Sequence, residues 1–495
     1  MSIKELEEIF VKLKSNDTNI TGLKIGKKTT NGVATPDEAL VVSVAEKIPL
    51  NLLKQDKVIP KYIEIGGSNF KTDVVEHVYN IAMPSPARCI SDASNLGALD
   101  PSSPIYLNRS YINPLSGGCN FSKWTPTTIN EYGTLGGIFR DKTDNTYVGL
   151  TNRHCVDKIC TVDTYNVDKL DYNNKFYEFI SLKVPFLNYY GSMEETFSKE
   201  LDIDVDPSYS STTVNFVSVV RNYSLNNTNY YQPSRAIEPN NIPISDMPYG
   251  KNYIGSFKRA ISVFPNYDVT SFYFNYVDAA LIGIKERINP TSRFQIGFNY
   301  TGEIKIATDA EIDLAYTNQY PLFFSGSRSG PIGNPGGNAC DLRISSNKVI
   351  ADVQDEFYPV KYSFSDIVEF ESSSLIALEG GDSGSIIWAQ YPDGWKIIGL
   401  NFASSLNNLT GEIRGLFCRI TNVFEELNID VWNGEPLNIS EPNHEIILKN
   451  QIQFIKNSPL TQTNKAVNSI KIDGEDYYFI GMRETDKYND ITYTV

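Results

Sequence analysis

Three residues far apart in the chain, Ser383, His154 and Asp278, have the side chains that nucleophilic catalysis needs. Ser383 lies in the stretch GGDSGS, where glycines flank a serine beside an acid. A serine hydroxyl is a poor nucleophile at neutral pH, so it needs a base to take its proton and a third group to orient that base. A chain that brought these three side chains together could transfer acyl groups through a covalent intermediate.

The chain has only three histidines that could be the base, His77, His154 and His444. His154 lies in YVGLTNRHCVD, at the end of an apolar strand where the chain turns, and such a place can hold an imidazole at the rim of a cleft. His77 and His444 lie among polar residues outside the β-rich region. His154 is therefore the expected base.

Asp278 is the expected orienting carboxylate, because it lies in the apolar run FNYVDAALIGI. An unpaired carboxylate costs several kcal/mol to bury, so a buried partner is expected. The alternative interpretation is an aspartate that caps a turn at the end of a strand. The G-x-S-x-G elbow of the α/β-hydrolases is not present, because Ser385 stands at its last glycine.

Short apolar runs with β-type composition must position these residues. From Gly133 onward the runs GTLGGIF, YVGLTN, DAALIGI, SGSIIW and WKIIGLNF alternate with turn residues, which predicts a β-barrel or sandwich closed by a helix near residue 421. Before it, an amphipathic helix in residues 1–16 precedes a pattern of strand, strand, helix and strand, with the helix in PLNLLKQDKVIPKYI.

These patterns divide the chain into four parts. Residues 1–85 form a small α+β domain, residues 86–132 a connector rich in turn residues, residues 133–430 the β-rich unit, and residues 431–495 a short C-terminal β-rich extension with a hairpin around Asp473. The Tyr/Asn-rich stretch between residues 161 and 265 is expected to contribute long surface loops.

The composition limits the classes of binding partner that we expect. With 495 residues, 41% hydrophobic residues and a net charge of -15, the chain is expected to be soluble, to bind no nucleic acid and to enter no membrane. The first residues do not resemble a secretory signal, and six cysteines without paired spacing indicate neither a disulfide framework nor zinc. We therefore expect a cytoplasmic protein without a metal or cofactor.

The order His154, Asp278, Ser383 matches chymotrypsin and differs from subtilisin and the α/β-hydrolases. The stretches TNRHC, VDAALI and GGDSGS resemble the trypsin-like, chymotrypsin-fold serine peptidases. With ITGLKIG, DEALVVSV, TDVVEH, GTLGGIF and GSRSG, the chain looks most like the trypsin-like peptidases with an N-terminal α+β domain that occur in bacteria and as the plant NARROW LEAF 1 proteins. This resemblance covers residues 20 to 430 apart from the connector and the Tyr/Asn-rich stretch.

The resemblance implies two six-stranded antiparallel β-barrels, with the active site in the cleft between them. His154 and Asp278 would lie on the first barrel and Ser383 on the second, and the N–H groups of Gly381 and Ser383 would form the oxyanion hole.

Two features depart from the digestive members of this family. Cys155 follows the histidine but has no cysteine in GTLGGIFRD to bridge it, so we interpret it as a small buried residue. In trypsin a freshly cut N-terminus pairs with the acid equivalent to Asp382, whereas here about 130 residues precede the barrel. Either Asp382 has another partner in an always-formed site, or cleavage or a binding partner switches the enzyme.

Substrate preference rests on four residues. Ala377 stands where trypsin keeps its selective aspartate, and with Leu378 it predicts a pocket for a medium or large uncharged side chain. Asn401 and Phe402 in IGLNFAS are expected on an edge strand against which an extended peptide pairs, with an ordinary barrel strand as the alternative.

The sequence therefore predicts a serine endopeptidase that acts on a protein or peptide substrate and that processing, a regulatory protein partner or self-association controls. A scaffolding or binding protein that keeps a peptidase fold with a blocked or substrate-restricted site is the alternative. An esterase or lipase would share the chemistry but lacks the elbow.

Overall fold

The computed structural model describes residues 1–30, 33–81, 108, 112, 114–123, 132–156, 204–205, 229–232, 253–261, 263, 274–284, 302–333, 341–354, 361–372, 380–406, 413–434, 469–472 and 475–478. The predictions for Ala377, Leu378 and His444 lie outside the described residues.

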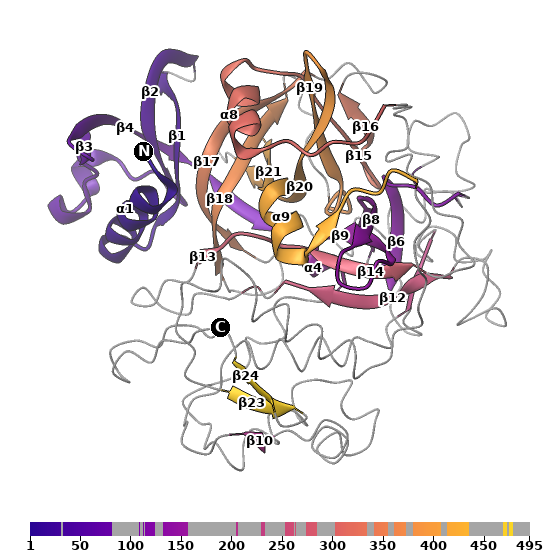
Figure 1. The fold of residues 1–495 in the computed structure, drawn as a ribbon. Helices are drawn as coiled ribbons and strands as arrows, with labels where there is room; N and C mark the ends of the chain where they lie inside the picture. Colours follow the sequence, from indigo (N-terminus) through magenta and orange to yellow (C-terminus); the bar gives the residue numbers. More distant parts are fainter. Residues whose placement is uncertain are drawn as a thin grey trace, which may run out of the picture.

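The described part of the chain is mostly β, and its two large curled sheets are consistent with a chymotrypsin-like fold (Figure 1). The first is an eight-stranded sheet. Its strands, in order across the sheet, are β22 (Ile429–Asp430), β8 (Gly137–Asp141), β9 (Tyr147–Thr151), β14 (Ala280–Ile284), β12 (Tyr253–Ala260), β11 (Asn229–Tyr231), β6 (Cys119–Lys123) and β7 (Tyr132–Leu135). The strand β6 lies within the predicted connector, and β11 and β12 lie within the predicted loop stretch.

The second sheet has 13 strands. Along its main path they are β16 (Gly330–Gly333), β15 (Leu322–Gly326), β19 (Ile386–Tyr391), β20 (Gly394–Leu406), β21 (Ile413–Arg419), β18 (Lys361–Ser372), β17 (Leu342–Gln354), β1 (Ile20–Thr30), β2 (Val33–Val44), β4 (Ser68–Glu76) and β3 (Tyr62–Ile65). Two further strands lie off this path: β13 (Phe274–Asn275) pairs with β18, and β5 (Val78–Ile81) pairs with both β17 and β20. Through β5, the strands β20, β21, β18 and β17 close into a ring of five strands, whereas the described pairings of the first sheet form an open series. Two six-stranded barrels therefore stay a prediction.

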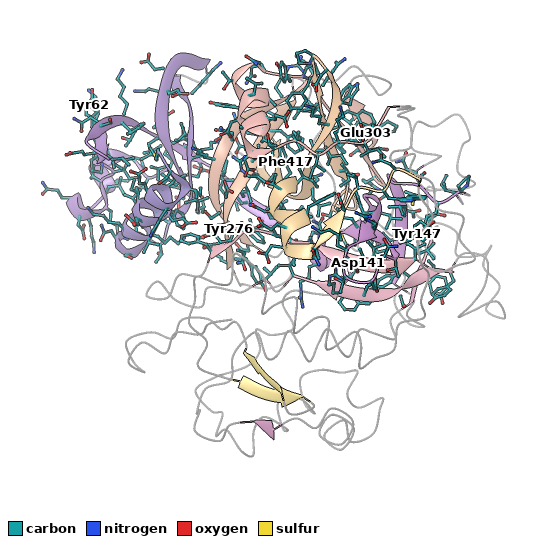
Figure 2. All side chains as sticks on the ribbon, viewed as in Figure 1. Tyr62, Asp141, Tyr147, Tyr276, Glu303 and Phe417 are labelled. Carbon is teal, nitrogen blue, oxygen red and sulfur yellow. The ribbon has the colours of Figure 1, made fainter. Side chains whose placement is uncertain are left out.

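Trp388 and Ile386 of the second sheet share one core cluster with Phe139 and Leu281 of the first, so the two sheets pack against each other. Within the first sheet, Asp141 (labelled in Figure 2) accepts hydrogen bonds from both terminal nitrogens of Arg259, at 2.6 and 2.9 Å. Both side chains are buried, and the guanidinium stabilises the carboxylate against the cost of that burial. A buried ion pair thus joins β8 to β12.

The N-terminal unit begins with the predicted helix, α1 (Ile3–Asn16). Ser2 and Glu5 form a capping box at its start, and Leu6 and Phe10 are buried beneath it. The helix predicted in PLNLLKQDKVIPKYI is wrong, because this stretch forms two 3₁₀ turns, η1 (Leu50–Leu52) and η2 (Gln55–Lys57), followed by β3. Neither turn has a side-chain cap at its start, and Pro60 disfavours the α-helical conformation at the residue before it.

The N-terminal unit is joined to the second sheet by continuous strand pairing, because β1 lies antiparallel to β17 with Gly22 opposite Ala351 (Figure 1). A Cβ at Gly22 would lie 2.7 Å from the Tyr79 ring, so only glycine permits this approach. The helix α1 also contacts the segment that leads to Asp278, since the Tyr276 hydroxyl (labelled in Figure 2) donates to Glu7 at 2.9 Å.

A buried charged cluster fastens this junction. Lys24 on β1 lies 2.5 Å from Glu369 on β18, and Arg414 lies 2.9 Å from the same carboxylate oxygen. Burial would raise the pKa of Glu369, but Lys24 and Arg414 outweigh it and hold that pKa well below its usual range. The carboxylate therefore stays ionised at neutral pH, and the stability that it contributes is lost only as the pH falls through its lowered pKa.

We expect Glu369→Ala to destabilise the protein by about 3–5 kcal/mol, because it leaves the buried Lys24 ammonium without its counter-ion. Urea unfolding followed by circular dichroism measures the loss. The matched control is Lys71→Met, which removes an ion pair to Asp37 whose side chains are 45% and 57% exposed, and which should leave the midpoint nearly unchanged. Equal midpoints for Glu369→Ala and the wild type would show that the cluster does not hold the junction.

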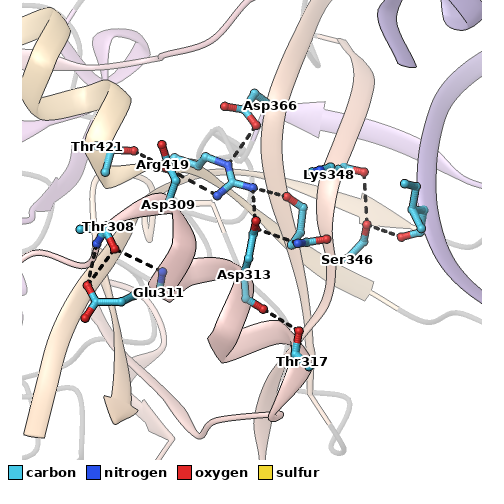
Figure 3. A network of polar contacts seen from close by, with 12 residues as sticks. Thr308, Asp309, Glu311, Asp313, Thr317, Ser346, Lys348, Asp366, Arg419 and Thr421 are labelled. Carbon is cyan, nitrogen blue, oxygen red and sulfur yellow. Dashed lines mark hydrogen bonds and ion pairs between the residues drawn. The ribbon is translucent and has the colours of Figure 1, made fainter. Parts of the chain in front are cut away.

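Two helices flank the second sheet, α8 (Asp309–Thr317) and the predicted α9 (Ile420–Leu427). Arg419 joins them to the sheet, since its guanidinium lies 3.0 Å from Asp366 on β18 and 3.3 Å from Asp313 on α8 (Figure 3). The helix α8 was not predicted, although Thr308 and Glu311 form a capping box at its start.

A separate three-stranded sheet contains β10 (Asp204–Val205), β23 (Ser469–Ile472) and β24 (Glu475–Tyr478). The strands β23 and β24 are antiparallel, as the predicted hairpin requires. Among the described residues, no helix is long and apolar enough to cross a membrane.

Candidate active site

The structure brings His154 and Asp278 together. His154 lies in the short helix α4 (Arg153–Val156), which follows the end of β9, and Asp278 lies between β13 and β14. The His154 Nδ1 atom is 2.5 Å from Asp278 Oδ2, and the two side chains are 1% and 0% exposed. A buried imidazole in contact with a buried carboxylate is the arrangement that fixes the tautomer of a catalytic base.

The backbone at the start of α4 holds the Asp278 carboxylate in place. Its Oδ1 atom accepts from the Arg153 N–H at 2.8 Å and from the His154 N–H at 3.3 Å, while the Asn152 side chain donates to the Asp278 carbonyl at 2.6 Å. Oδ1 is therefore committed to the backbone, and Oδ2 is left to face the imidazole. The carboxylate binds its histidine in a single orientation.

Burial lowers the pKa of His154, but the Asp278 carboxylate in contact with Nδ1 outweighs it, and the pKa is raised well above its usual value. A general base must be neutral, so hydrolysis should rise with pH, with the midpoint of the rising limb above the ordinary histidine value of about 6.5. The charged form stabilises the fold below that ordinary value, and this stabilisation is lost as the pH rises through the raised pKa. The pH profile of kcat/KM tests this, and a midpoint at or below about 6.5 would contradict it.

Ser383 lies in the tight turn before β19, against the end of the first sheet. Its carbonyl accepts from the Thr134 N–H at 2.8 Å and from the Cys155 thiol at 3.7 Å. Its hydroxyl donates to the Phe402 carbonyl at 3.5 Å. Because Cys155 follows His154 directly, these contacts place the serine turn beside the helix that carries the histidine.

The second ring nitrogen of His154, Nε2, is buried and makes no hydrogen bond to any part of the chain that the structure describes. In this conformation the Ser383 hydroxyl is turned to Phe402, so the serine-to-histidine hydrogen bond is not formed. Such bonds are often long in enzymes without substrate and tighten when substrate binds.

Gly381 is held by residues from both sheets. Its carbonyl accepts from the Thr134 hydroxyl at 2.8 Å and from the Ser327 hydroxyl at 2.7 Å. Its φ of 112° is a conformation that favours glycine. Gly384, with φ 92°, is equally constrained, because a Cβ there would lie 2.2 Å from the Thr134 carbonyl. The glycines of GGDSGS are thus required by the shape of this turn.

Asp382, which is fully buried, has its partners in the turn between β15 and β16. Its Oδ1 atom accepts from the Arg328 N–H and the Ser329 N–H, each at 2.9 Å, and its Oδ2 atom accepts from the Ser329 hydroxyl at 2.5 Å. A Cβ at Gly326 would collide with this carboxylate at 2.1 Å. In this structure Asp382 therefore has internal partners.

Thr134 in GTLGGIF and Ser327 and Ser329 in GSRSG were not predicted as site residues. All three bind the turn that carries Ser383, and the first two also bind each other, since the Ser327 N–H donates to the Thr134 hydroxyl at 2.8 Å. The available signal was a hydroxyl residue next to glycine in each of these two stretches.

Of the residues predicted to bind substrate, the structure describes Asn401 and Phe402, which lie on β20. Asn401 and Phe402 are both buried, and the Phe402 carbonyl accepts the hydrogen bond from the Ser383 hydroxyl. The Asn401 backbone is already paired, because its carbonyl accepts from Gly384 and its N–H donates to Ser385, each at 2.9 Å.

His77 lies away from these residues, buried near Lys24, and burial lowers its pKa to about 3. The free cysteines among the described residues are Cys119, Cys155 and Cys418, and Cys155 is only partly buried. In that part of the chain no group of three or more histidine, cysteine or acidic residues is placed to hold a metal.

No protein-family model matches the chain, and no curated protein matches it. A solved structure of a glutamic-acid-specific serine protease, described as using a histidine triad in substrate binding, aligns with 64% of this chain and 100% of its own, at 12% identity and a TM-score of 0.32. A similarity of that size carries no argument about the activity of this chain.

Proposed function

We propose that the protein is a serine peptidase in which Ser383 attacks the carbonyl of the scissile bond, His154 is the base and Asp278 orients His154. The observation that carries this proposal is the 2.5 Å contact between His154 and Asp278, two buried side chains from segments 124 residues apart. Burying such a pair costs free energy that an ordinary turn cap does not require. The adjacent serine turn supplies the nucleophile.

The proposed reaction has two steps. The Ser383 oxygen attacks the carbonyl carbon while His154 Nε2 takes the hydroxyl proton, and the imidazolium then gives that proton to the leaving amine as the amide bond breaks. Water, deprotonated by His154, next attacks the carbonyl carbon of the acyl-enzyme, and the imidazolium returns the proton to the Ser383 oxygen as the ester bond breaks and the acid leaves. The N–H groups of Gly381 and Ser383 are proposed to bind the oxyanion, and losing one such donor would cost about 3 kcal/mol.

Finer assignments are proposals as well. The quoted motifs support a place among the NARROW LEAF 1-like trypsin-type peptidases with endopeptidase activity. The free thiol of Cys155 supports a reducing compartment such as the cytoplasm. The internal partners of Asp382 support a site that needs no processing, so any control would come from a protein partner or self-association.

The rival proposal is a scaffolding protein with a blocked site, and the burial of Ser383, which is 1% exposed, favours it. Hydrolysis separates the two. The wild type should hydrolyse a p-nitrophenyl ester and a peptide p-nitroanilide of an uncharged residue, and Ser383→Ala and His154→Ala should each abolish both reactions. Hydrolysis of the ester alone would indicate an esterase. A folded protein that hydrolyses neither substrate would contradict the peptidase proposal and support the scaffolding protein.

A further inference from the structure

The strand β5 lies on the edge of β20 beside the proposed nucleophile. It is antiparallel to β20, with Val78 opposite Leu406 and Ile81 opposite Ala403. On its other side β5 runs parallel to β17, with Tyr79 opposite Val353. The chain that leaves the N-terminal unit is thus inserted between two strands of the second sheet.

The register of the β5–β20 pairing brings the end of β5 close to Ser383. Ala403, the partner of Ile81, follows Phe402, whose carbonyl accepts from the Ser383 hydroxyl. Because the pairing is antiparallel, β5 runs along β20 toward Ser383. A peptide whose residues before the scissile bond paired with β20 in the same antiparallel sense would have the same direction and would need the same edge.

Little of this edge is left for a substrate. The strand β19 pairs with β20 as far as Leu400, and the Asn401 backbone is bonded to Gly384 and Ser385. From Ala403 onward, β20 pairs with β5. Among the described pairings, only Phe402 lies between them. One substrate residue fits opposite this gap, and an extended strand does not.

The core holds β5 firmly. Tyr79 is fully buried, its hydroxyl is 2.8 Å from the Ser43 hydroxyl, and its ring fills the space above Gly22. Displacing β5 would expose this ring and break pairing on both sides, so substrate does not displace β5 at low cost.

We propose that β5 determines specificity by filling the part of β20 that would otherwise pair with substrate residues further from the scissile bond. The substrates are then peptides cut near their N-terminus, or other compounds with a short acyl part. This inference rests on the proposed serine peptidase chemistry, but it replaces endopeptidase activity with cleavage near the N-terminus, because an endopeptidase that binds a long strand on β20 would need that edge free.

A series of peptide p-nitroanilides with one, two and four residues before the scissile bond, all with the same last residue, tests the proposal in the wild type. We expect kcat/KM for the four-residue peptide to stay within about threefold of the one-residue compound, or below it. Two further backbone hydrogen bonds on a free edge would add roughly five- to 150-fold. A rise of about tenfold or more with length would overturn the proposal.

A disulfide test locates β5 without using activity. Asn80 lies opposite Ser404 and both are half-buried, so Asn80→Cys with Ser404→Cys should form a cross-link on mild oxidation, detected by peptide mapping. The control is Asn80→Cys with Ser405→Cys, because Ser405 pairs with Tyr79 and points to the other face of β20.

The cross-link should form in the first pair and not in the control. No cross-link in the first pair would overturn the placement of β5 and the proposal with it. A cross-link in a protein that hydrolyses no member of the peptide series would instead show that the peptidase function fails while β5 lies where the structure places it.

Discussion

Replacing Asp278 with asparagine should lower kcat/KM by about 10⁴-fold while the protein stays folded. The Arg153 and His154 N–H groups that now bind Oδ1 would bind the amide oxygen, so the amide NH₂ would face the imidazole. It would donate to Nδ1, force the proton onto Nε2 and leave no lone pair there to accept the Ser383 proton.

Steady-state hydrolysis of a peptide p-nitroanilide measures this loss, with circular dichroism to confirm folding. Asp430→Asn is the matched control, because Asp430 pairs with Arg140 at the surface, and it should retain wild-type activity. An Asp278→Asn enzyme within tenfold of the wild type would show that another acid orients the histidine.

The second large effect is expected at Asp382. Asp382→Ala removes the acceptor of three hydrogen bonds that tie the serine turn to the β15–β16 turn, and the Gly381 and Ser383 N–H groups would lose their fixed direction. We expect kcat to fall by about 10²–10³-fold, the loss typical of a missing oxyanion donor. Ser329→Ala removes one of the three bonds and should cost roughly tenfold.

Asp382→Asn is the conservative control, because its amide oxygen can still accept from the Arg328 and Ser329 N–H groups and should recover most of the activity. The loss should fall on kcat more than on KM, since the oxyanion donors act in the transition state. An Asp382→Ala protein that melts like the wild type and retains its kcat would show that these bonds do not shape the oxyanion hole.

The sequence predicts the pair at the centre of this site for a physical reason. A carboxylate in an apolar run needs a buried partner, and a histidine at the end of a strand was the available one. The helices α1 and α9 could also be predicted from the sequence, because their apolar residues recur at helical spacing. Local sequence is therefore informative where the structure of a segment depends mainly on its own residues.

The partners of Asp382 and the place of β5 could not be predicted in this way. Asp382 is bound partly by backbone N–H groups, which every residue but proline carries, so no side-chain type marks them. The strand β5 pairs with a strand more than 300 residues away, and a four-residue apolar segment does not specify which edge it joins. Between residues 49 and 63 the apolar spacing predicted a helix, but the two 3₁₀ turns that form there have no side-chain caps, and Pro60 disfavours a helix at the residue before it.

Covalent labelling with a fluorophosphonate, followed by peptide mapping, tests the central claim most directly. The proposed site predicts one adduct, on the peptide that contains Ser383, formed in the wild type and in Asp430→Asn and lost in His154→Ala and Ser383→Ala. A folded wild type that takes up no label, or an adduct on a different residue, would contradict the assignment of Ser383 as the nucleophile.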